Sequence, residues 1–150
     1  GRIMNERLAV KVRNSEPKAS LAWTAERDPG VFGKLSSPVV VDDHLYGICM
    51  NGELRCVEVG TGTRKWETTK PALNSDKGAN SGGAFIVKNG DKFFIFGETG
   101  HLVIAKLSPK GYEEIDRAKI VEPTGNTFGR NYVWTHPAFA NKCAFVRNDK

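Results

Sequence analysis

The chain alternates short apolar runs with pairs of turn-forming residues, a pattern typical of short antiparallel strands. The first clear set of runs covers positions 37–41, 45–50 and 54–59 and a short stretch that ends at Trp66. The pairs between the runs are Asp42-Asp43, Asn51-Gly52 and Thr61-Gly62. Because Asn-Gly between apolar runs is a strong hairpin signal, this stretch predicts four sequential antiparallel strands. Such a meander has the size of one propeller blade.

The same pattern recurs along the chain. Apolar runs at 83–88, 92–96, 101–107 and 112–121 repeat it, and a third copy opens at Thr135 and continues through Val146. Gly52-Glu53-Leu54 and Gly100-His101-Leu102 are 48 residues apart, and Pro38 and Pro137 are 99 residues apart. A period near 50 residues indicates a β-propeller built from repeated blades.

The two ends of the chain complete this pattern. Residues 8–12 match 54–58, and residues 21–24 match the stretch around Trp66. We therefore predict an all-β fold, a partial β-propeller with four-stranded antiparallel blades, as a single domain over 1–150. Its expected parts are the outer strands of one blade (1–33), two full blades (34–72 and 82–121) and the inner strands of a further blade (132–150).

Propeller blades pack face to face, so their inner strands are expected to be apolar on both faces. The run Phe93-Phe94-Ile95-Phe96 fits this expectation. We expect Trp66 to pack between its own blade and the next one, and Trp23 to do the same one blade earlier. The alternative, in which these tryptophans stack on a ligand or a sugar, is the weaker interpretation.

Composition and charge narrow the function classes. The 150 residues are 39% hydrophobic and carry a formal net charge of +5. No run reaches the roughly 18 apolar residues of a membrane-spanning helix, so no membrane span is expected. Lys and Arg are interspersed with acids, which argues against a nucleic-acid partner. The first residue is Gly1, and no signal peptide precedes the strands, so we expect a piece of a longer chain or a cleaved tag.

Cysteine, histidine and acidic residues form no recognisable chemical motif. Cys49, Cys56 and Cys143 lack zinc spacing and are expected in the core as small apolar residues. The stretch 60–65 lacks the pattern of a phosphate-binding loop. The histidines (His44, His101 and His136) show no ligand pairing, and six acids are expected singly in turns: Asp42, Asp43, Glu53, Asp76, Asp91 and Glu98. No catalytic, cofactor-binding or metal-binding residue is predicted.

The connections between blades offer the best candidate surface. The stretches 28–34, 71–83 and 122–132 each precede the innermost strand of a blade, so they are expected to gather at one end of the propeller axis. Loops on a rigid scaffold often carry the binding residues. The candidate partner-binding residues are Phe32, Asn80, Asn126, Phe128, Arg130 and Asn131. The alternative is that these loops are ordinary solvated connections.

The stretch from Cys56 to Trp66 resembles the repeat of pyrroloquinoline-quinone-like (PQQ-like) β-propellers. That repeat has a small residue, an aliphatic residue, Asp, two variable residues, Thr-Gly, three variable residues and Trp. Here Glu58 replaces the Asp, and the second copy has Ser108 to Gly111 in place of Thr-Gly and no Trp. The resemblance implies the propeller fold, and it implies two classes of function.

One class consists of non-catalytic extracytoplasmic scaffolds, including the outer-membrane assembly lipoprotein of the BamB type. The other class consists of quinoprotein dehydrogenases, which carry PQQ, usually with a calcium ion, on the propeller axis. We expect a non-catalytic module in a periplasmic or secreted location with a protein or cell-envelope partner and no cofactor. The alternative is a fragment of a PQQ-dependent oxidoreductase. A third hypothesis, a binder of acidic polymers, rests on the positive charge alone.

The blade arithmetic predicts an assembly. Three blades are too few to close a ring, since propellers have four to eight. The two half blades at the chain ends complement each other, and unpaired strand edges favour aggregation. We expect a homodimer that completes a six-bladed ring, each N-terminal strand pair finishing the last blade of its partner, or else a segment of a longer propeller chain.

Overall fold

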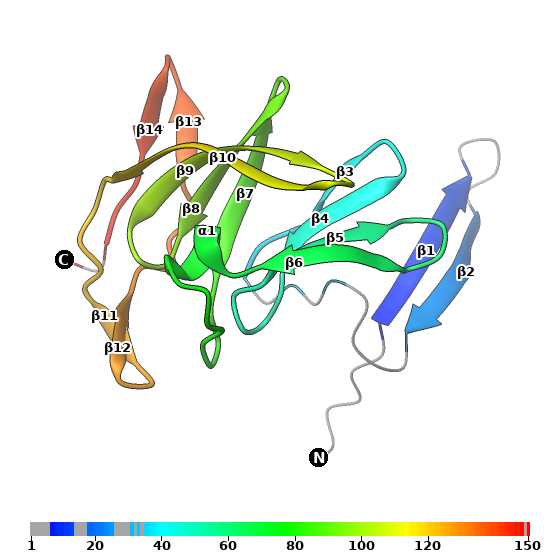
Figure 1. The fold of residues 1–150 in the computed structure, drawn as a ribbon, viewed down its shortest axis with the longest axis horizontal. Helices are drawn as coiled ribbons and strands as arrows, with labels where there is room; N and C mark the ends of the chain where they lie inside the picture. The colour runs from blue at the N-terminus through cyan, green and yellow to red at the C-terminus, as the bar shows by residue number, and fades with distance from the viewer. Residues whose placement is uncertain (1–6, 14–17, 26–30, 32, 34, 149) are drawn as a thin grey trace.

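The protein is an all-β chain of antiparallel sheets with a single short helix in the part that is described. The computed structural model describes residues 7–13, 18–25, 31, 33, 35–148 and 150, and side chains from Val31 onward (Figure 1). Every strand pair in this part is antiparallel. The expected all-β class is therefore confirmed, while closure into a propeller is outside what the described residues form.

Two four-stranded meanders make up the centre of the molecule. The first sheet has the order β3-β4-β5-β6, and the second has the order β7-β8-β9-β10. Their strands are β3 (Val39–Val41), β4 (His44–Ile48), β5 (Leu54–Glu58), β6 (Arg64–Thr68), β7 (Ala84–Asn89), β8 (Lys92–Gly97), β9 (His101–Ser108) and β10 (Gly111–Lys119). The four-residue helix α1 (Lys70–Leu73) follows β6 and has Pro71 in its first turn, where proline is well tolerated.

Three two-stranded hairpins complete the structure. They are β1 (Arg7–Arg13) with β2 (Lys18–Ala25), β11 (Gly125–Thr127) with β12 (Arg130–Tyr132), and β13 (Ala138–Ala140) with β14 (Cys143–Phe145). In Figure 1, β1 and β2 lie at one side of the molecule and β13 and β14 at the other. The hairpin β11–β12 is a difference from the sequence expectation, which treated 122–132 as a loop.

The turns show where the sequence pattern was followed. Asp42-Asp43 joins β3 to β4 and Asn141-Lys142 joins β13 to β14, both as two-residue turns. The Asn51-Gly52 pair instead lies inside a longer connection, closed by a 2.7 Å hydrogen bond from Cys49 N to Glu53 O. Gly52 has φ 87°, and a Cβ there would lie 2.8 Å from Leu73 Cγ, so backbone angle and space both require glycine.

A β-bulge occurs at the same place in three sheets. In β5–β6, Cys56 is opposite Trp66 and Val57 is opposite Arg64, so one residue of β6 is left over. In β9–β10 the corresponding pairs are Ile104 with Asp116 and Ala105 with Glu114. In β1–β2 they are Ala9 with Trp23 and Val10 with Leu21.

A bulge adds twist at a defined position, so its recurrence marks a structural repeat. Cys56 and Ile104 differ by the same 48 residues that separate Gly52 from Gly100. The register also corrects the sequence match by one residue, because Ala9 and not Val10 corresponds to Cys56. Trp23 and Trp66 do occupy equivalent positions, as the sequence predicted.

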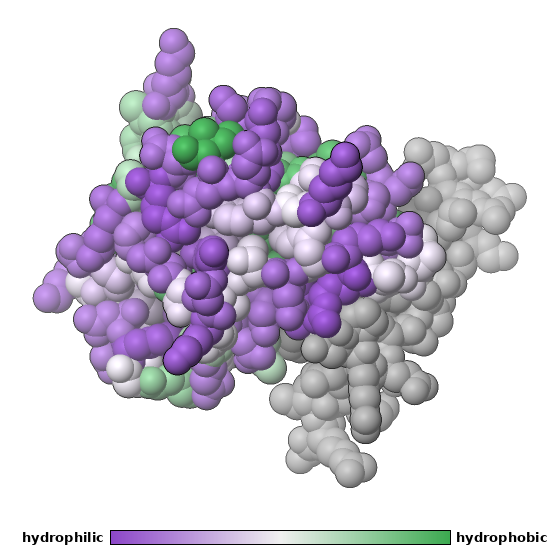
Figure 2. Space-filling model, in the orientation of Figure 1, coloured by the Kyte–Doolittle hydropathy of each residue, from purple (hydrophilic) through white to green (hydrophobic). Residues whose placement is uncertain are grey.

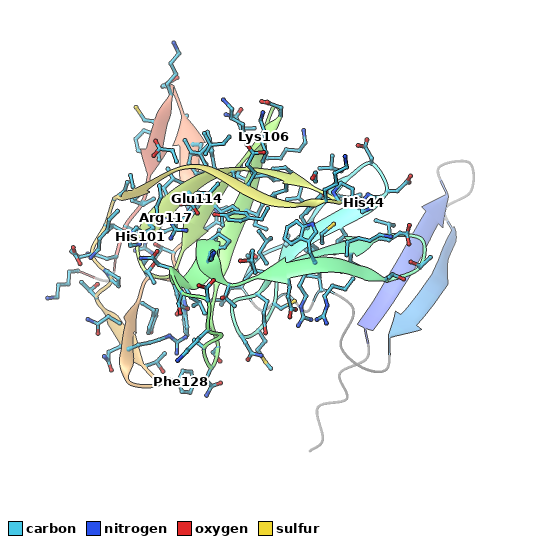
Figure 3. All side chains as sticks on the ribbon, viewed as in Figure 1. His44, His101, Lys106, Glu114, Arg117 and Phe128 are labelled. Atoms are coloured by element: carbon cyan, nitrogen blue, oxygen red, sulfur yellow. The ribbon has the colours of Figure 1, made fainter. Side chains whose placement is uncertain are left out.

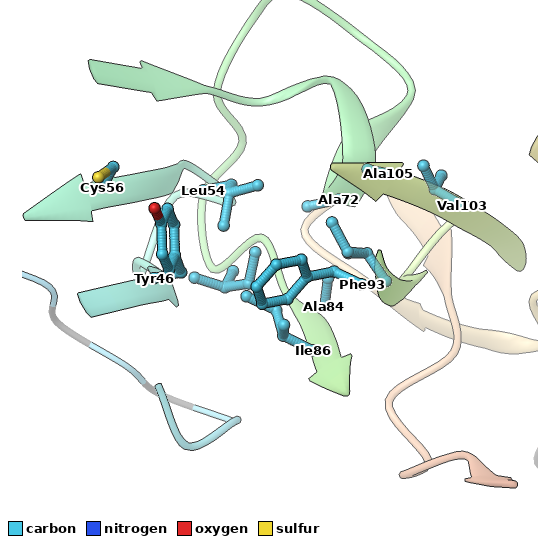
Figure 4. Close-up of a cluster of buried hydrophobic side chains, with 11 residues drawn as sticks. Tyr46, Leu54, Cys56, Ala72, Ala84, Ile86, Phe93, Val103 and Ala105 are labelled. Carbon is cyan, nitrogen blue, oxygen red and sulfur yellow. The ribbon is translucent and has the colours of Figure 1, made fainter. Parts of the chain in front are cut away.

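The main core lies between the two four-stranded sheets (Figure 4). Tyr46, Leu54 and Cys56 come from the first sheet, and Ile86, Phe93 and Val103 are among the residues that meet them from the second. A smaller cluster of Phe85, Phe96 and Val133 covers the other face of the second sheet. The second sheet is thus buried on both faces, as expected for a sheet that stands between two neighbours.

Trp66 links the first sheet to the second. Its indole is half-buried against the core, and Nε1 donates a 2.7 Å hydrogen bond to the carbonyl oxygen of Ser108 at the end of β9. Its ring centroid lies 6.1 Å from that of Tyr46. The expectation that Trp66 packs between two sheets is confirmed; the side chain of Trp23 lies outside the described residues.

The cysteines divide into two groups. Cys49 and Cys56 are buried, as predicted, whereas Cys143 is exposed on β14. The core assignment of Cys143 was therefore wrong, because β14 has a paired strand on only one side in the described chain. The face of the molecule drawn in Figure 2 is mainly hydrophilic. No helix in the described part has the length and apolar character needed to cross a membrane.

Candidate functional site

The hairpin β11–β12 carries the most unusual backbone on the surface. Thr127 pairs with Arg130, so Phe128 and Gly129 form a two-residue turn, with φ of 49° and 75°. Turns of this kind strongly favour Asn-Gly because both positions are left-handed. Phe128 departs from that preference at a cost of about 1 kcal/mol. An aromatic residue in this conformation points to a role for its side chain.

The side chain of Phe128 is unprotected at the tip of this hairpin. It is 59% exposed and lies at the end of β11–β12 that points away from the sheets (Figure 3). The guanidinium carbon of Arg130 lies 6.0 Å from the centre of its ring. Across the two strands, Asn126 Nδ2 donates to Asn131 Oδ1 at 2.9 Å. The tip therefore combines an exposed aromatic ring, a cation and two amides.

Glu98 attaches this hairpin to the second sheet. The carboxylate is only 1% exposed and accepts three hydrogen bonds: from Arg130 Nε at 2.7 Å, from Trp134 Nε1 at 3.0 Å and from the Gly83 amide at 2.9 Å. The Val133 amide also donates to the Glu98 carbonyl at 2.9 Å. Since a buried carboxylate with several donors is held tightly, the chain on the C-terminal side of the hairpin is fixed to the β8–β9 turn.

The expectation that Glu98 is an isolated turn acid was wrong. It follows the apolar strand β8 directly, and that strand is buried, so the carboxylate is carried into the interior. The sequence contains a signal for this: an acid that ends a strongly apolar run, with a lone Arg in the next connection. Trp134 and Glu98 are the site residues that sequence reasoning missed.

The predicted partner-binding residues have different outcomes. Four of them, Asn126, Phe128, Arg130 and Asn131, lie together on β11–β12. Asn80 is exposed on the 74–83 connection, whose Ala79 amide donates to Asn51 O. This connection and β11–β12 both extend toward the lower edge of Figure 1. Phe32 lies outside the described residues.

A second polar cluster joins β10 to α1. Arg117 makes a two-armed ion pair with Glu114, and it also donates to Asn74 Oδ1 at 2.8 Å and to Lys70 O at 3.2 Å. The Arg117 hydrogen bonds lower the pKa of Glu114 to about 2. Tyr112, whose hydroxyl donates to Glu114, has its pKa raised chiefly by burial. All these groups are mutually satisfied, so the cluster is a structural connection between the sheets.

The histidines lie far from one another in the fold. His44 is in β4 and His101 is in β9, while the ring of His136 lies 4.8 Å from that of Phe85. Burial, followed by the charges of Arg117 and Lys119, lowers the pKa of His101. Among the described residues, no group of three or more His, Cys, Asp or Glu side chains is arranged to hold a metal ion.

The calcium ion implied by the quinoprotein alternative does not fit the donors near the hairpin. A calcium site needs several converging oxygen ligands. Glu98 is the buried carboxylate here, and both of its oxygens already accept hydrogen bonds from N–H groups of Gly83, Arg130 and Trp134. The arrangement is thus suited to holding backbone and side chains in place rather than to binding a cation.

Comparison with known proteins adds no assignment. No protein-family model matches the chain, and no curated protein sequence matches it significantly. The structure by itself defines an all-β protein with two packed antiparallel meanders and a firmly attached surface hairpin.

Proposed function

We propose that this chain is a section of a β-propeller of the PQQ-like type and acts as a non-catalytic scaffold that binds a protein partner through the β11–β12 tip. The observation that carries the binding role is Phe128, an aromatic residue that is 59% exposed in a left-handed turn position. Aromatic residues and arginine are the usual anchors of protein interfaces. Phe128 and Arg130 supply both on one hairpin.

The propeller assignment is supported by the repeated meander and its repeated bulge. The sheets β3–β6 and β7–β10 share strand order and bulge position, and they pack face to face around one core. The resemblance of residues 56–66 to the PQQ-like repeat gives the family. It also gives the expected setting, a cell-envelope partner outside the cytoplasm.

The rigidity of the tip supports binding rather than a passive loop. Glu98 fixes Arg130 and Trp134, and the rings of Tyr132 and Trp134 stack with centroids 3.9 Å apart. A surface that is already ordered loses less conformational entropy when it binds. Phe128 is therefore presented in a defined position.

The test compares Phe128→Asn with the unchanged chain. Asn is favoured at this turn position, so the variant is expected to be more stable by about 0.5–1 kcal/mol. Proteins retained from a cell-envelope extract by the immobilised chain are identified, and the strongest is purified and titrated by calorimetry. We expect Phe128→Asn to weaken its affinity at least about tenfold, the usual effect of removing an aromatic anchor.

The matched control is Asp42→Asn. Asp42 occupies the first position of another two-residue turn and also has a left-handed φ, 51°, so the same residue enters the same geometry elsewhere on the surface. The control should bind like the unchanged chain. Equal affinities for Phe128→Asn and Asp42→Asn would overturn the proposed binding surface.

A cofactor titration tests the non-catalytic part of the proposal. The chain is mixed with PQQ and calcium, and the absorbance spectrum of the quinone and dye-linked alcohol oxidation are followed. We expect an unchanged spectrum and no oxidation. A saturable spectral change would replace the scaffold by the quinoprotein interpretation.

A further inference from the structure

The hairpin β13–β14 has the geometry of the inner half of a four-stranded sheet. Like β3 and β4, its strands are joined by a two-residue turn, and Ala138 is opposite Phe145 as Val39 is opposite Tyr46. Phe145 therefore stands at the position of Tyr46, 99 residues later, the same interval that separates Pro38 from Pro137. In the first sheet, β5 and β6 follow on the open side of β4.

The two aromatic residues have opposite environments. Tyr46 is 2% exposed, and it lies opposite Cys56 on β5, which is in turn opposite Trp66 on β6. Phe145 is 57% exposed, and its neighbour Cys143 is exposed as well. In the described chain β14 pairs only with β13, so the side on which a third strand would pair is open.

A groove adjoins this hairpin. Its volume is about 720 Å³, and it lies between the outer face of the second sheet, with Phe94 and Ile104, and the hairpin, with Phe139 and Cys143. Most of its exposed lining is apolar, and the rings of Phe94 and Phe139 lie 5.0 Å apart at its base. The space is thus shaped by one complete sheet and one half sheet.

The chain contains a strand pair with the register of the missing half. β1 and β2 share with β5 and β6 the bulge, its position and the tryptophan that follows it. By this register Ala9 corresponds to Cys56, and Lys11 corresponds to Glu58. Within the chain, β1–β2 belongs to a separate two-stranded sheet, on the opposite side of the molecule from β14 (Figure 1).

We propose that the open side of β14 binds the β1–β2 hairpin of a second copy of this chain, in the register that β5 has on β4. Ala9 of one copy then lies opposite Phe145 of the other, and Lys11 lies opposite Cys143. The two-fold arrangement repeats the contact, since each copy offers both a β1–β2 hairpin and a β14 edge. The partner class and the register deepen the proposed propeller function, on which they rest.

The occupant follows from the match of the two halves. β4 receives β5 and β6 within the chain, and β1–β2 has the same strand lengths to within a few residues and the same bulge. Pairing with the outside of β14 satisfies the backbone groups of an edge strand, which otherwise favours unspecific association. The remaining open side of β1 is the one that β5 uses for β4.

A disulfide trap tests the register. The variant Lys11→Cys is incubated in a glutathione disulfide buffer, with native Cys143 as its only exposed partner among the described cysteines. Cross-strand neighbours lie close enough for a disulfide. We expect a disulfide-linked dimer on a non-reducing gel, which disappears on reduction and in Lys11→Cys/Cys143→Ser.

The matched control is Val12→Cys, one residue further along β1, where the side-chain direction reverses. It should give little of the linked dimer. Equal linkage in Lys11→Cys and Val12→Cys, no linkage in either, or a disulfide within one chain would each overturn the proposal. Phe128 has no part in this contact, so Phe128→Asn in the Lys11→Cys background should still be trapped; the trap and the partner titration thus fail independently.

Discussion

The hairpins β3–β4 and β13–β14 have the same turn length and the same register but very different burial. Tyr46 on β4 is covered by the strands that follow it, with its ring centroid 5.6 Å from Phe93 and 6.1 Å from Trp66. Phe145 on β14 stands at the same position and is mostly exposed. The comparison shows that an inner strand pair does not bury its own aromatic residue. The outer pair does so, and it determines which residues become core.

The strongest way to break this comparison is truncation of the two aromatic residues. Tyr46→Ala removes a buried ring and is expected to lower the free energy of unfolding by about 3–5 kcal/mol. Phe145→Ala at high dilution, where chains are apart, should change it by less than about 0.5 kcal/mol, as surface substitutions do. Denaturant titration measures both. Similar losses for the two variants would contradict the difference in burial.

Glu98 tests how the C-terminal hairpin is held beside the second sheet. Glu98→Gln keeps the size of the side chain but leaves Arg130 without its anion, which is expected to cost about 3 kcal/mol. The amide also turns one acceptor into a donor that faces Trp134 or Gly83. Thermal unfolding followed by circular dichroism gives the loss. The control is Glu122→Gln, whose partner Lys119 is in an exposed pair; a loss no larger than in this control would show that Glu98 is not an anchor.

Trp66 sharpens the comparison on the side of the complete sheet. Trp66→Phe keeps an aromatic ring but removes the hydrogen bond from Nε1 to Ser108 O. The expected loss in unfolding free energy is about 1–2 kcal/mol, from the hydrogen bond and the smaller ring. Denaturant midpoints at constant slope report it. An unchanged midpoint would mean that the link between the two sheets contributes nothing.

The smallest expected effect is the pH dependence of the link between β10 and α1. Arg117 lowers the folded-state pKa of Glu114 to about 2, below the value of about 4.3 in an unfolded chain. Its contribution is therefore complete above about pH 4.3 and is lost as the pH falls toward 2. Because the pair is partly exposed, the effect should be below about 1 kcal/mol.

Thermal midpoints of the unchanged chain and of Glu114→Gln between neutral and acidic pH test this sign. The difference between the two should narrow as the solution becomes acidic. A difference that is constant with pH would show that the ionised carboxylate of Glu114 has no stabilising role in this contact.

The sequence predicted the meanders because their turns use residues with known backbone preferences. Asp42-Asp43 and Asn141-Lys142 join the strands that the pattern predicted. The hairpin β11–β12 was missed because its strands have three residues each and its turn has Phe where Asn is usual. Only the fold around it makes that turn acceptable.

The candidate site was partly predictable for a similar reason. Arg130 and its neighbours were identified from loop position alone, whereas Glu98 was placed in an exposed turn. The burial of Glu98 depends on Trp134 and Gly83, which are distant in sequence and meet it only after the sheets have packed. Side-chain spacing in one strand contains no information about such a contact.

The mass of the folded chain in solution tests the central claim, that the two half sheets at the chain ends are complementary, most directly. Light scattering at micromolar concentration should give about 33 kDa, twice the 16.5 kDa of one chain, with the circular dichroism of a β-sheet protein. A folded species of 16.5 kDa at that concentration would contradict the account, because β14 would then remain open in a stable molecule.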